Sequence, residues 1–321
     1  MNIAFTTQFP MEGFAGLSDH NLCCPLDEAD ILIAAFNNPV SKTAIDKMPR
    51  LRLIANFGVG YDNIDLDACR QRGIRVTNTP YPVIEATAEL CWALLHALIR
   101  RTAELDQRVR NDTIEQPGVM SNLSHSLYGL RLGIIGMGHI GTAVARRALA
   151  SGLEVVYHNR KPIPVNEQPT LINYPMSDVT QAMHQLTIQN ATYVSMDTLL
   201  RSSDIISLHL PYTPQVRHLL DFAQFGMMKP SAYIINTARG SLINEEALLN
   251  ALTENKIRGA ALDVFETEPH INPQLKNLNN VVLSPHVGTA TWETRMTMCQ
   301  NVTDNILAFI KGDTQQMNIV L

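Results

Sequence analysis

The chain lacks the features that would tie it to a membrane or to nucleic acid. Nowhere do about 18 consecutive apolar residues occur, so no segment is expected to cross a bilayer as a helix. The first residues lack a cationic start followed by a long apolar stretch, which argues against export. The 25 basic and 30 acidic residues form neither a basic stripe nor an acidic tail. We therefore expect no nucleic-acid partner and no membrane partner.

Cysteine is also scarce and is not patterned. Of the five cysteines, Cys23 and Cys24 are adjacent and the other three are isolated, which gives neither a disulfide framework nor zinc-ligand spacing. We expect no bound metal and a reducing, cytoplasmic location. What the chain does have is a 45% share of apolar residues over 321 positions, enough for two ordinary globular cores.

Short apolar runs alternate with helical stretches along the chain. One series is NIAF, DILIAAF, LRLIANF and IRVTN, and a second is LRLGIIG, LEVVYHN, DIISLHLP, AYIINTA, GAALDVF and NVVLSP. This alternation predicts an α/β protein with two doubly wound parallel sheets. A helix predicted over 83–102 could bridge them, and another after Thr289, ending near Gly312, could return the chain to the first. The predicted domains are 1–100 with 288–321, and 101–287.

The second series opens with a glycine pattern between an apolar run and a helical run. In it, the first glycine permits a tight turn, the second lets backbone approach a pyrophosphate, and the third allows close helix packing. The helix N-terminus would face the phosphates. We predict a dinucleotide site formed by Gly136, Gly138, His139, Ile140 and Gly141. An ordinary strand-to-helix turn is the alternative.

The next strand lacks the acidic residue that usually binds the ribose 2′-hydroxyl of NAD. His158 or Asn159 occupies that place, and Arg160 and Lys161 follow. A 2′-phosphate would meet positive charge here. We predict that Asn159, Arg160 and Lys161 favour NADP(H), with NAD still possible. The alternative is that the two cations are merely solvated in a loop.

Three residues in the C-terminal third each follow a strand-like run. Arg239 follows AYIINTA, Glu268 follows GAALDVF, and His286 follows NVVLSP. Such ends meet at one edge of a parallel sheet. The arginine fork suits a carboxylate, and a carboxylate beside an imidazole favours the charged ring, a ready acid. Together they predict reduction of a 2-oxo acid, although each alone could be a surface ion pair, a loop cap or a core histidine.

A further glycine pair follows the run LRLIA in the first series. Backbone amides around Val59 and Gly60 could form a nest for an anion such as a substrate carboxylate. A simple glycine turn capped by Asp62 or Asn63 is the alternative.

These motifs resemble the D-isomer-specific 2-hydroxyacid dehydrogenase family over nearly the whole chain. The segments that carry the resemblance, in the family's order, are NFGVGYDNID, VTNTPYPVIEATAEL, LGIIGMGHIG, SLHLPYTPQVRHLL, INTARGSLINEEAL, GAALDVFETEP and SPHVGTATWETR. The resemblance implies a substrate domain made of both chain ends, an inserted Rossmann cofactor domain and a homodimer.

The resemblance also implies roles for single residues. Arg239 would bind the substrate carboxylate and polarise the keto oxygen, His286 would donate the proton, and Glu268 would hold and charge His286. On the cofactor side, Asp263 would contact the nicotinamide carboxamide and Thr237 would line the site. Backbone groups of Val59 and Gly60 would take the carboxylate.

Within the family, YHNRK and SPHVGTATWETR are similar to glyoxylate/hydroxypyruvate reductases, which generally use NADPH. We therefore expect an NADPH-preferring reductase of glyoxylate and hydroxypyruvate. The alternatives are an NAD-dependent enzyme for D-lactate, branched or phosphoglycerate-type substrates, and a non-enzymatic dinucleotide sensor like the corepressors of this fold. Two departures from the family are Tyr81-Pro82 and the long stretch 162–190, which is expected to form a surface excursion with a short helix.

Overall fold

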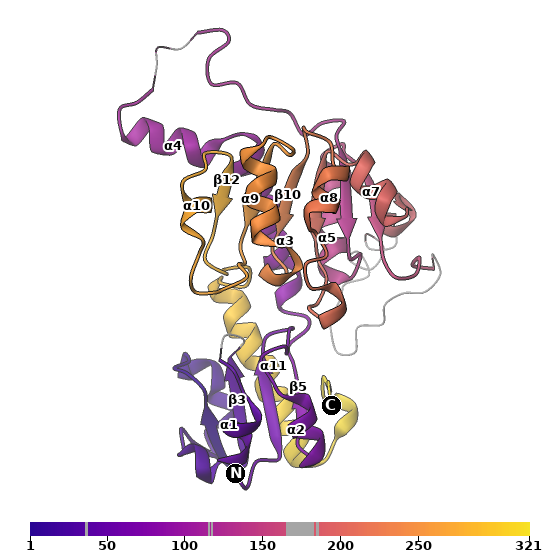
Figure 1. Ribbon diagram of the computed structural model, residues 1–321. Helices are drawn as coiled ribbons and strands as arrows, with labels where there is room; N and C mark the ends of the chain where they lie inside the picture. Colours follow the sequence, from indigo (N-terminus) through magenta and orange to yellow (C-terminus); the bar gives the residue numbers. More distant parts are fainter. Residues whose placement is uncertain (36–37, 115, 117, 165–182, 184–185) are drawn as a thin grey trace. The chain divides into compact units, whose positions relative to one another are not determined.

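A computed structural model describes residues 1–35, 38–114, 116, 118–164, 183 and 186–321. These residues form two compact α/β units, the first made of Met1–Ala86 with Thr289–Leu321 and the second running from Thr87 to Gly288 (Figure 1). The division falls inside helix α3 (Val83–Ile99), and the boundary expected near residue 100 lies at the other end of that helix. Most of the excursion predicted over 162–190 lies outside the described residues.

The first unit contains a five-stranded sheet in the order β2-β1-β3-β4-β5, with every strand pairing parallel. Its strands are β1 (Asn2–Phe5), β2 (Asn21–Leu22), β3 (Ile31–Ala35), β4 (Leu53–Phe57) and β5 (Arg75–Thr77). Its helices are α1 (Lys42–Asp46), α2 (Leu66–Gln71) and α11 (Trp292–Lys311). Every residue of β3 and β4 is buried, as expected for parallel strands covered on both faces.

The second unit contains a seven-stranded parallel sheet in the order β12-β11-β10-β9-β6-β7-β8. Its strands are β6 (Arg131–Ile135), β7 (Glu154–His158), β8 (Ala191–Tyr193), β9 (Ile205–Leu208), β10 (Tyr233–Asn236), β11 (Gly259–Leu262) and β12 (Val281–Leu283). Its described helices, besides α3, are α4 (Thr102–Arg110), α5 (His139–Ala150), α7 (Met196–Ser202), α8 (Phe222–Met227), α9 (Glu245–Thr253) and α10 (Pro273–Lys276). The predicted fold class, two parallel α/β domains, is confirmed.

The order of strands in the second sheet decides where a ligand can bind. The chain runs outward from β6 through β7 to β8, then crosses back to β9 on the other side of β6. The loops that follow β6 and β9 therefore diverge, and ligands of such sheets bind in that crevice at the carboxyl ends of the strands.

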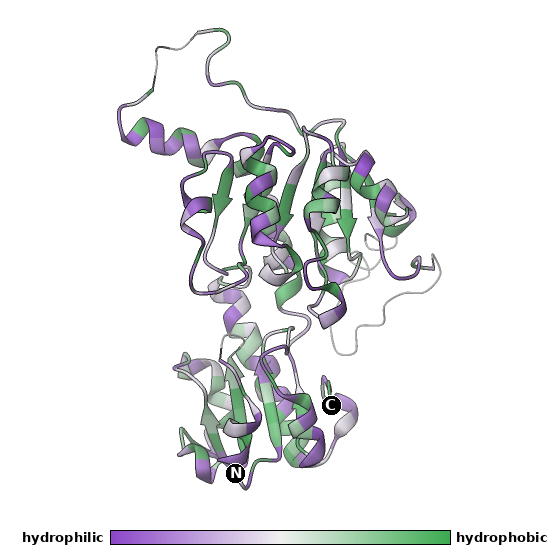
Figure 2. Cartoon of the chain, viewed as in Figure 1, coloured by the Kyte–Doolittle hydropathy of each residue, from purple (hydrophilic) through white to green (hydrophobic). Residues whose placement is uncertain are grey.

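The core of the second unit explains why this sheet is stable. Apolar residues are concentrated along the strands (Figure 2), and β9, β10 and β11 are buried at every position. Helices α8 and α9 add buried Phe225, Leu248 and Leu252 to the same cluster, each contributing about 1.5–3 kcal/mol on burial. Asn244 caps α9 by accepting the amide hydrogens of Glu246 and Ala247.

Of the two helices whose ends the sequence predicted, one differs from the prediction and one matches it. The helix predicted over 83–102 ends at Ile99, because Arg101 adopts a left-handed backbone (φ 56°) from which α4 starts. The C-terminal helix ends at Gly312 (φ 77°), as predicted. Among the described residues, no helix is long and apolar enough to cross a membrane. All five cysteines carry free thiols.

Candidate active site

The three glycines of the loop after β6 have different surroundings. Gly136 has a φ of +99°, and a Cβ there would approach the His209 carbonyl oxygen to 2.7 Å. A Cβ on Gly141 would lie 2.3 Å from the Gly136 oxygen, so both positions require glycine for the packing of the chain itself. A Cβ on Gly138, by contrast, would meet no atom of the described residues within 4 Å.

This open space lies where a phosphate would be expected. Gly138 is the N-cap of α5 and, as a glycine, has no side chain with which to cap the first amides of that helix. An uncapped N-terminus beside an open glycine suits a pyrophosphate, because the amides and the helix dipole both favour negative charge. The residues present therefore fit the dinucleotide that the motif predicts.

The loop after β7 presents two cations next to this turn. The side-chain oxygen of Asn159 accepts the amide hydrogen of Met137 at 2.7 Å, so Asn159 is tied to the glycine loop. Arg160 and Lys161 are exposed. In the part of the chain that the structure describes, neither forms a hydrogen bond or ion pair. They are available to an anionic ligand.

Glu268 and His286 meet after β11 and β12. Glu268 Oε2 lies 2.7 Å from His286 Nδ1, and Glu268 Oε1 accepts the amide hydrogen of Phe265 at 2.9 Å. Burial acts to raise the pKa of Glu268, but hydrogen bonds from His286 and Phe265 and the nearby charge of Arg239 outweigh it, and the pKa is lowered. Glu268 is thus a carboxylate at neutral pH. About a third of each side chain, 31% of His286 and 33% of Glu268, remains exposed.

Arg239 lies at the end of β10, on the same edge of the sheet. The Asn236 side chain fixes the backbone around Arg239, because it accepts the amide hydrogen of Ala238 and donates to the carbonyl of Arg239. A Cβ on Gly240 would lie 1.9 Å from the carbonyl carbon of Phe265, so the loops after β10 and β11 touch backbone to backbone. The sheet thereby brings the three residues predicted from the sequence to one edge.

Asp263 orients the loop that carries His286. Its buried carboxylate accepts hydrogen bonds from the Ser284 hydroxyl at 2.6 Å and from the amides of Val287 and Gly288 at 2.9 Å each. Its carbonyl accepts the amide hydrogen of His286, which has a φ of 55°. Sequence reasoning missed this role, although a buried carboxylate needs several donors. The expected contact of Asp263 with the nicotinamide stays a prediction, as does that of the buried Thr237 at the end of β10.

The switch-point loop after β9 contributes a buried polar chain. His209 Nε2 lies 2.8 Å from the Ser207 hydroxyl, which in turn lies 3.4 Å from the Cys91 sulfur. Burial lowers the pKa of His209 to about 4 and raises the pKa of Cys91 to about 11. Neither group is charged at neutral pH. These polar contacts connect Cys91 on α3 with the loop after β9, whose His209 carbonyl lies close to Gly136.

Asparagine side chains hold the glycine loop of the first unit. The Asn56 amide donates to the carbonyls of Gly58 and Gly60, and the Asn78 amide donates to the carbonyl of Val59. For the amide hydrogens of Val59 and Gly60, no acceptor occurs within the described ranges. These two donors are the ones the sequence analysis assigned to a carboxylate.

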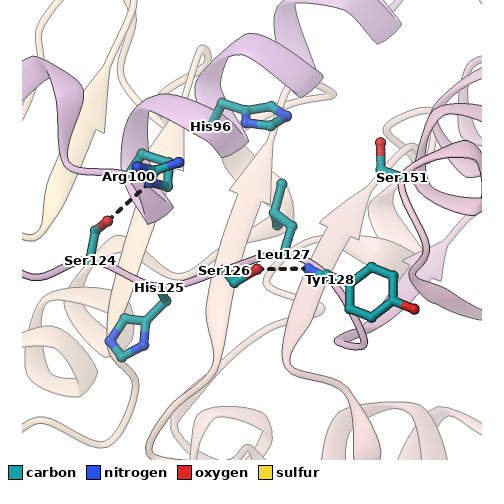
Figure 3. A pocket seen from close by; sticks show the side chains of 8 residues that line it. All are labelled: His96, Arg100, Ser124, His125, Ser126, Leu127, Tyr128 and Ser151. Atoms are coloured by element: carbon teal, nitrogen blue, oxygen red, sulfur yellow. Dashed lines mark hydrogen bonds between the residues drawn. The ribbon is translucent and has the colours of Figure 1, made fainter.

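A separate cavity of about 440 Å³ lies in the second unit, lined by eight residues that include His96, Arg100 and Tyr128 (Figure 3). Tyr128 precedes β6 and Ser151 precedes β7, so this cavity lies at the amino ends of the strands. The candidate residues lie at the carboxyl ends. The cavity is therefore not part of the candidate active site.

The sequence and fold match known proteins closely. Residues 92–288 match the family model described as D-isomer specific 2-hydroxyacid dehydrogenase, NAD binding domain. A glyoxylate reductase of Thermococcus litoralis is 41% identical over 290 residues, which cover 89% of this chain and 82% of that protein.

Two solved structures resemble the whole chain. One is a D-lactate dehydrogenase of Aquifex aeolicus with NAD and lactic acid (TM-score 0.82, 30% identity, 99% of each chain). The other is an NADPH-dependent glyoxylate/hydroxypyruvate reductase of Sinorhizobium meliloti with NADP and malonate. Its TM-score is 0.81 at 28% identity, and the match covers 96% of this chain and 93% of that one.

Proposed function

The chain belongs to the D-isomer-specific 2-hydroxyacid dehydrogenase family of NAD(P)-dependent oxidoreductases, and on that premise we propose that it is an NADPH-preferring reductase of small 2-oxo acids. The observation that carries the proposal is the Glu268–His286 pair, 2.7 Å apart, at the same sheet edge as Arg239 and the open glycine turn. The product would be a D-2-hydroxy acid.

The proposed chemistry assigns one task to each residue of the trio. A bound nicotinamide would supply the hydride to the keto carbon. Arg239 would bind the substrate carboxylate through its planar fork and polarise the keto oxygen. His286 would donate a proton to that oxygen from the ring nitrogen that does not face Glu268. Glu268, a carboxylate at neutral pH, would keep the ring charged and oriented.

The first unit would supply the rest of the substrate site. We assign the substrate carboxylate to the amide hydrogens of Val59 and Gly60 as well, because the side chains of Asn56 and Asn78 turn the neighbouring carbonyls away from them. The first unit is then the substrate domain and the second the cofactor domain. Thr237 and Asp263 remain the proposed contacts of the cofactor at the ends of β10 and β11.

The preference for NADPH rests on the loop after β7. Arg160 and Lys161 are exposed cations beside the turn that would hold the pyrophosphate, and no acidic residue occurs at 158–161, where one would receive a ribose hydroxyl. The similar Sinorhizobium meliloti reductase is NADPH-dependent.

Initial rates test both the cofactor and the substrate. Purified protein should oxidise NADPH faster than NADH, and should turn over glyoxylate and hydroxypyruvate faster than pyruvate, a branched 2-oxo acid or 3-phosphohydroxypyruvate. A preference for NADH with pyruvate would favour the second candidate, a D-lactate dehydrogenase, which the similarity to the Aquifex aeolicus enzyme supports. No turnover of any of the five acids would favour the remaining alternative, a non-enzymatic dinucleotide sensor.

We also propose that the protein is a cytoplasmic homodimer. The segment after α4 runs outside the α/β layers of the second unit (Figure 1) and exposes Val119 at 95% and Met120 at 76%, with Leu123 and Tyr128 also exposed. Large apolar side chains exposed along one segment favour contact with another protein, and we propose a second copy of this chain. Light scattering after gel filtration should give twice the mass of one chain. The five free thiols suit a reducing compartment.

A further inference from the structure

A second histidine–glutamate pair lies beside the first. His218 Nε2 is 2.7 Å from Glu266 Oε1, and the Arg217 guanidinium donates to the same oxygen at 2.9 Å. Glu266 stands two residues before Glu268 in one turn, while His218 comes from the loop after β9. Only 27% of the His218 side chain and 21% of the Glu266 side chain are exposed. Because the contact is largely shielded from water, it can hold a defined geometry.

The turn that presents Glu268 is fixed at several points. The amide hydrogen of Phe265 donates to Glu268, and the amide hydrogen of Glu266 donates to the carboxylate of Glu245 at 2.7 Å. The side chain of Glu266 is a third point of attachment, because its carboxylate accepts a hydrogen bond from the His218 ring. A shift of Glu266 would therefore move the amide that orients Glu268.

His218 also contacts the loop that carries Arg239. Its amide hydrogen donates to the carbonyl of Ser241 at 2.8 Å, and its backbone has a left-handed φ of 52°. Gly240 packs directly on the Phe265–Glu266 peptide. A single residue thus joins the loops after β9, β10 and β11, two of which carry members of the proposed trio.

We propose that His218 is a positioning residue, which through Glu266 sets the placement of Glu268 against His286. The proposal rests on the function proposed above. The His218 side chain acts on the reaction through Glu266 and Glu268, so replacing that side chain should affect the chemical step more than binding. An error of about 1 Å in a catalytic group costs on the order of a hundredfold in rate, which makes even a small shift measurable.

The test compares two substitutions of His218 with a matched control. His218→Leu removes the imidazole donor to Glu266 and leaves that of Arg217, whereas His218→Gln keeps an N–H donor at position 218. His20→Leu is the control, because His20 is also half-buried and lies in the other unit. For each protein we would measure kcat and KM for glyoxylate, the Kd for NADPH by fluorescence, and Tm.

With His218→Leu, kcat should fall about tenfold or more while KM and the Kd for NADPH stay within about twofold. His218→Gln should recover most of the lost kcat, and His20→Leu should match the wild type. A loss of Tm with kcat unchanged, or a loss carried by KM, would overturn the proposal.

A second readout needs no turnover and separates this proposal from that of function. Amide hydrogen exchange at Phe265 reports the contact with Glu268 directly. His218→Leu should speed that exchange about tenfold, and His20→Leu should leave it unchanged. Wild-type protein that turns over no 2-oxo acid would reject the proposed function, and unchanged exchange at Phe265 in His218→Leu would reject the positioning role.

Discussion

Replacing Glu268 with glutamine should lower the rate of the proposed reaction and change its pH dependence in a defined direction. The Glu268 carboxylate lies 2.7 Å from His286 Nδ1 and orients the ring. A hydrogen bond to a charged group contributes about 1.5–3 kcal/mol, and with a third of each side chain exposed we take the low end. A loss of about 1.4 kcal/mol in the transition state corresponds to a factor of ten in rate.

The sign follows from the pKa of Glu268. Burial acts to raise that pKa, but hydrogen bonds from His286 and Phe265 hold it below its ordinary value. As pH falls through this lowered pKa, the wild type gains a proton on Glu268 and kcat/KM falls. Glutamine has no such proton to gain, so for Glu268→Gln kcat/KM should be about tenfold lower at neutral pH and should lack this acid limb, and the two proteins should converge at acidic pH.

A matched control guards against a general effect of removing a carboxylate. Glu104 on α4 also has a lowered pKa, chiefly because Arg101 donates to it, and it lies outside the candidate site. Glu104→Gln should leave the pH profile unchanged. If Glu268→Gln kept the acid limb, or matched the wild type at neutral pH, the Glu268 carboxylate would have no part in the reaction.

Three further predictions concern the cofactor turn and the loop of His286. Gly138→Ala should leave Tm unchanged but raise the Kd for NADPH, because the new methyl group meets no atom of the described residues and fills the proposed phosphate space. Gly136→Ala should lower Tm, because its methyl group would meet the His209 carbonyl. Calorimetry measures Tm and fluorescence titration measures the Kd. Asp263→Asn should destabilise the protein by about 1–3 kcal/mol in urea unfolding. The carboxylate accepts three hydrogen bonds, and the NH₂ group of asparagine would face at least one of those donors without being able to accept from it. Arg160→Ala should raise the KM for NADPH but not for NADH, and equal effects would rule out recognition of the 2′-phosphate.

The sequence predicted the candidate catalytic residues from their positions after the ends of three strands. Arg239, Glu268 and His286 each follow a buried run, and parallel strands present their carboxyl ends at one edge, so their approach could be predicted without coordinates. The contact between Glu268 and His286 is formed, while the roles assigned to the three residues remain predictions.

What the sequence could not supply depends on backbone conformations that residue type does not reveal. His218 and His286 both adopt positive φ, which is uncommon outside glycine, and each owes its contacts to that geometry. For this reason the sequence did not predict the contact between His218 and Glu266. It also did not predict the hydrogen bonds between Asp263 and the loop after β12. Arg101 interrupts a helical pattern in the same way.

The exposure of Arg160 and Lys161 has a consequence for how such an enzyme changes over time. Because neither side chain supports the fold within the described residues, replacing them costs the protein almost no stability. On the cofactor role proposed for these two residues, a lineage can exchange one nicotinamide cofactor for the other by drift at these positions, without compensating changes in the core. The same freedom makes them the first sites to randomise in a library selected for altered cofactor use.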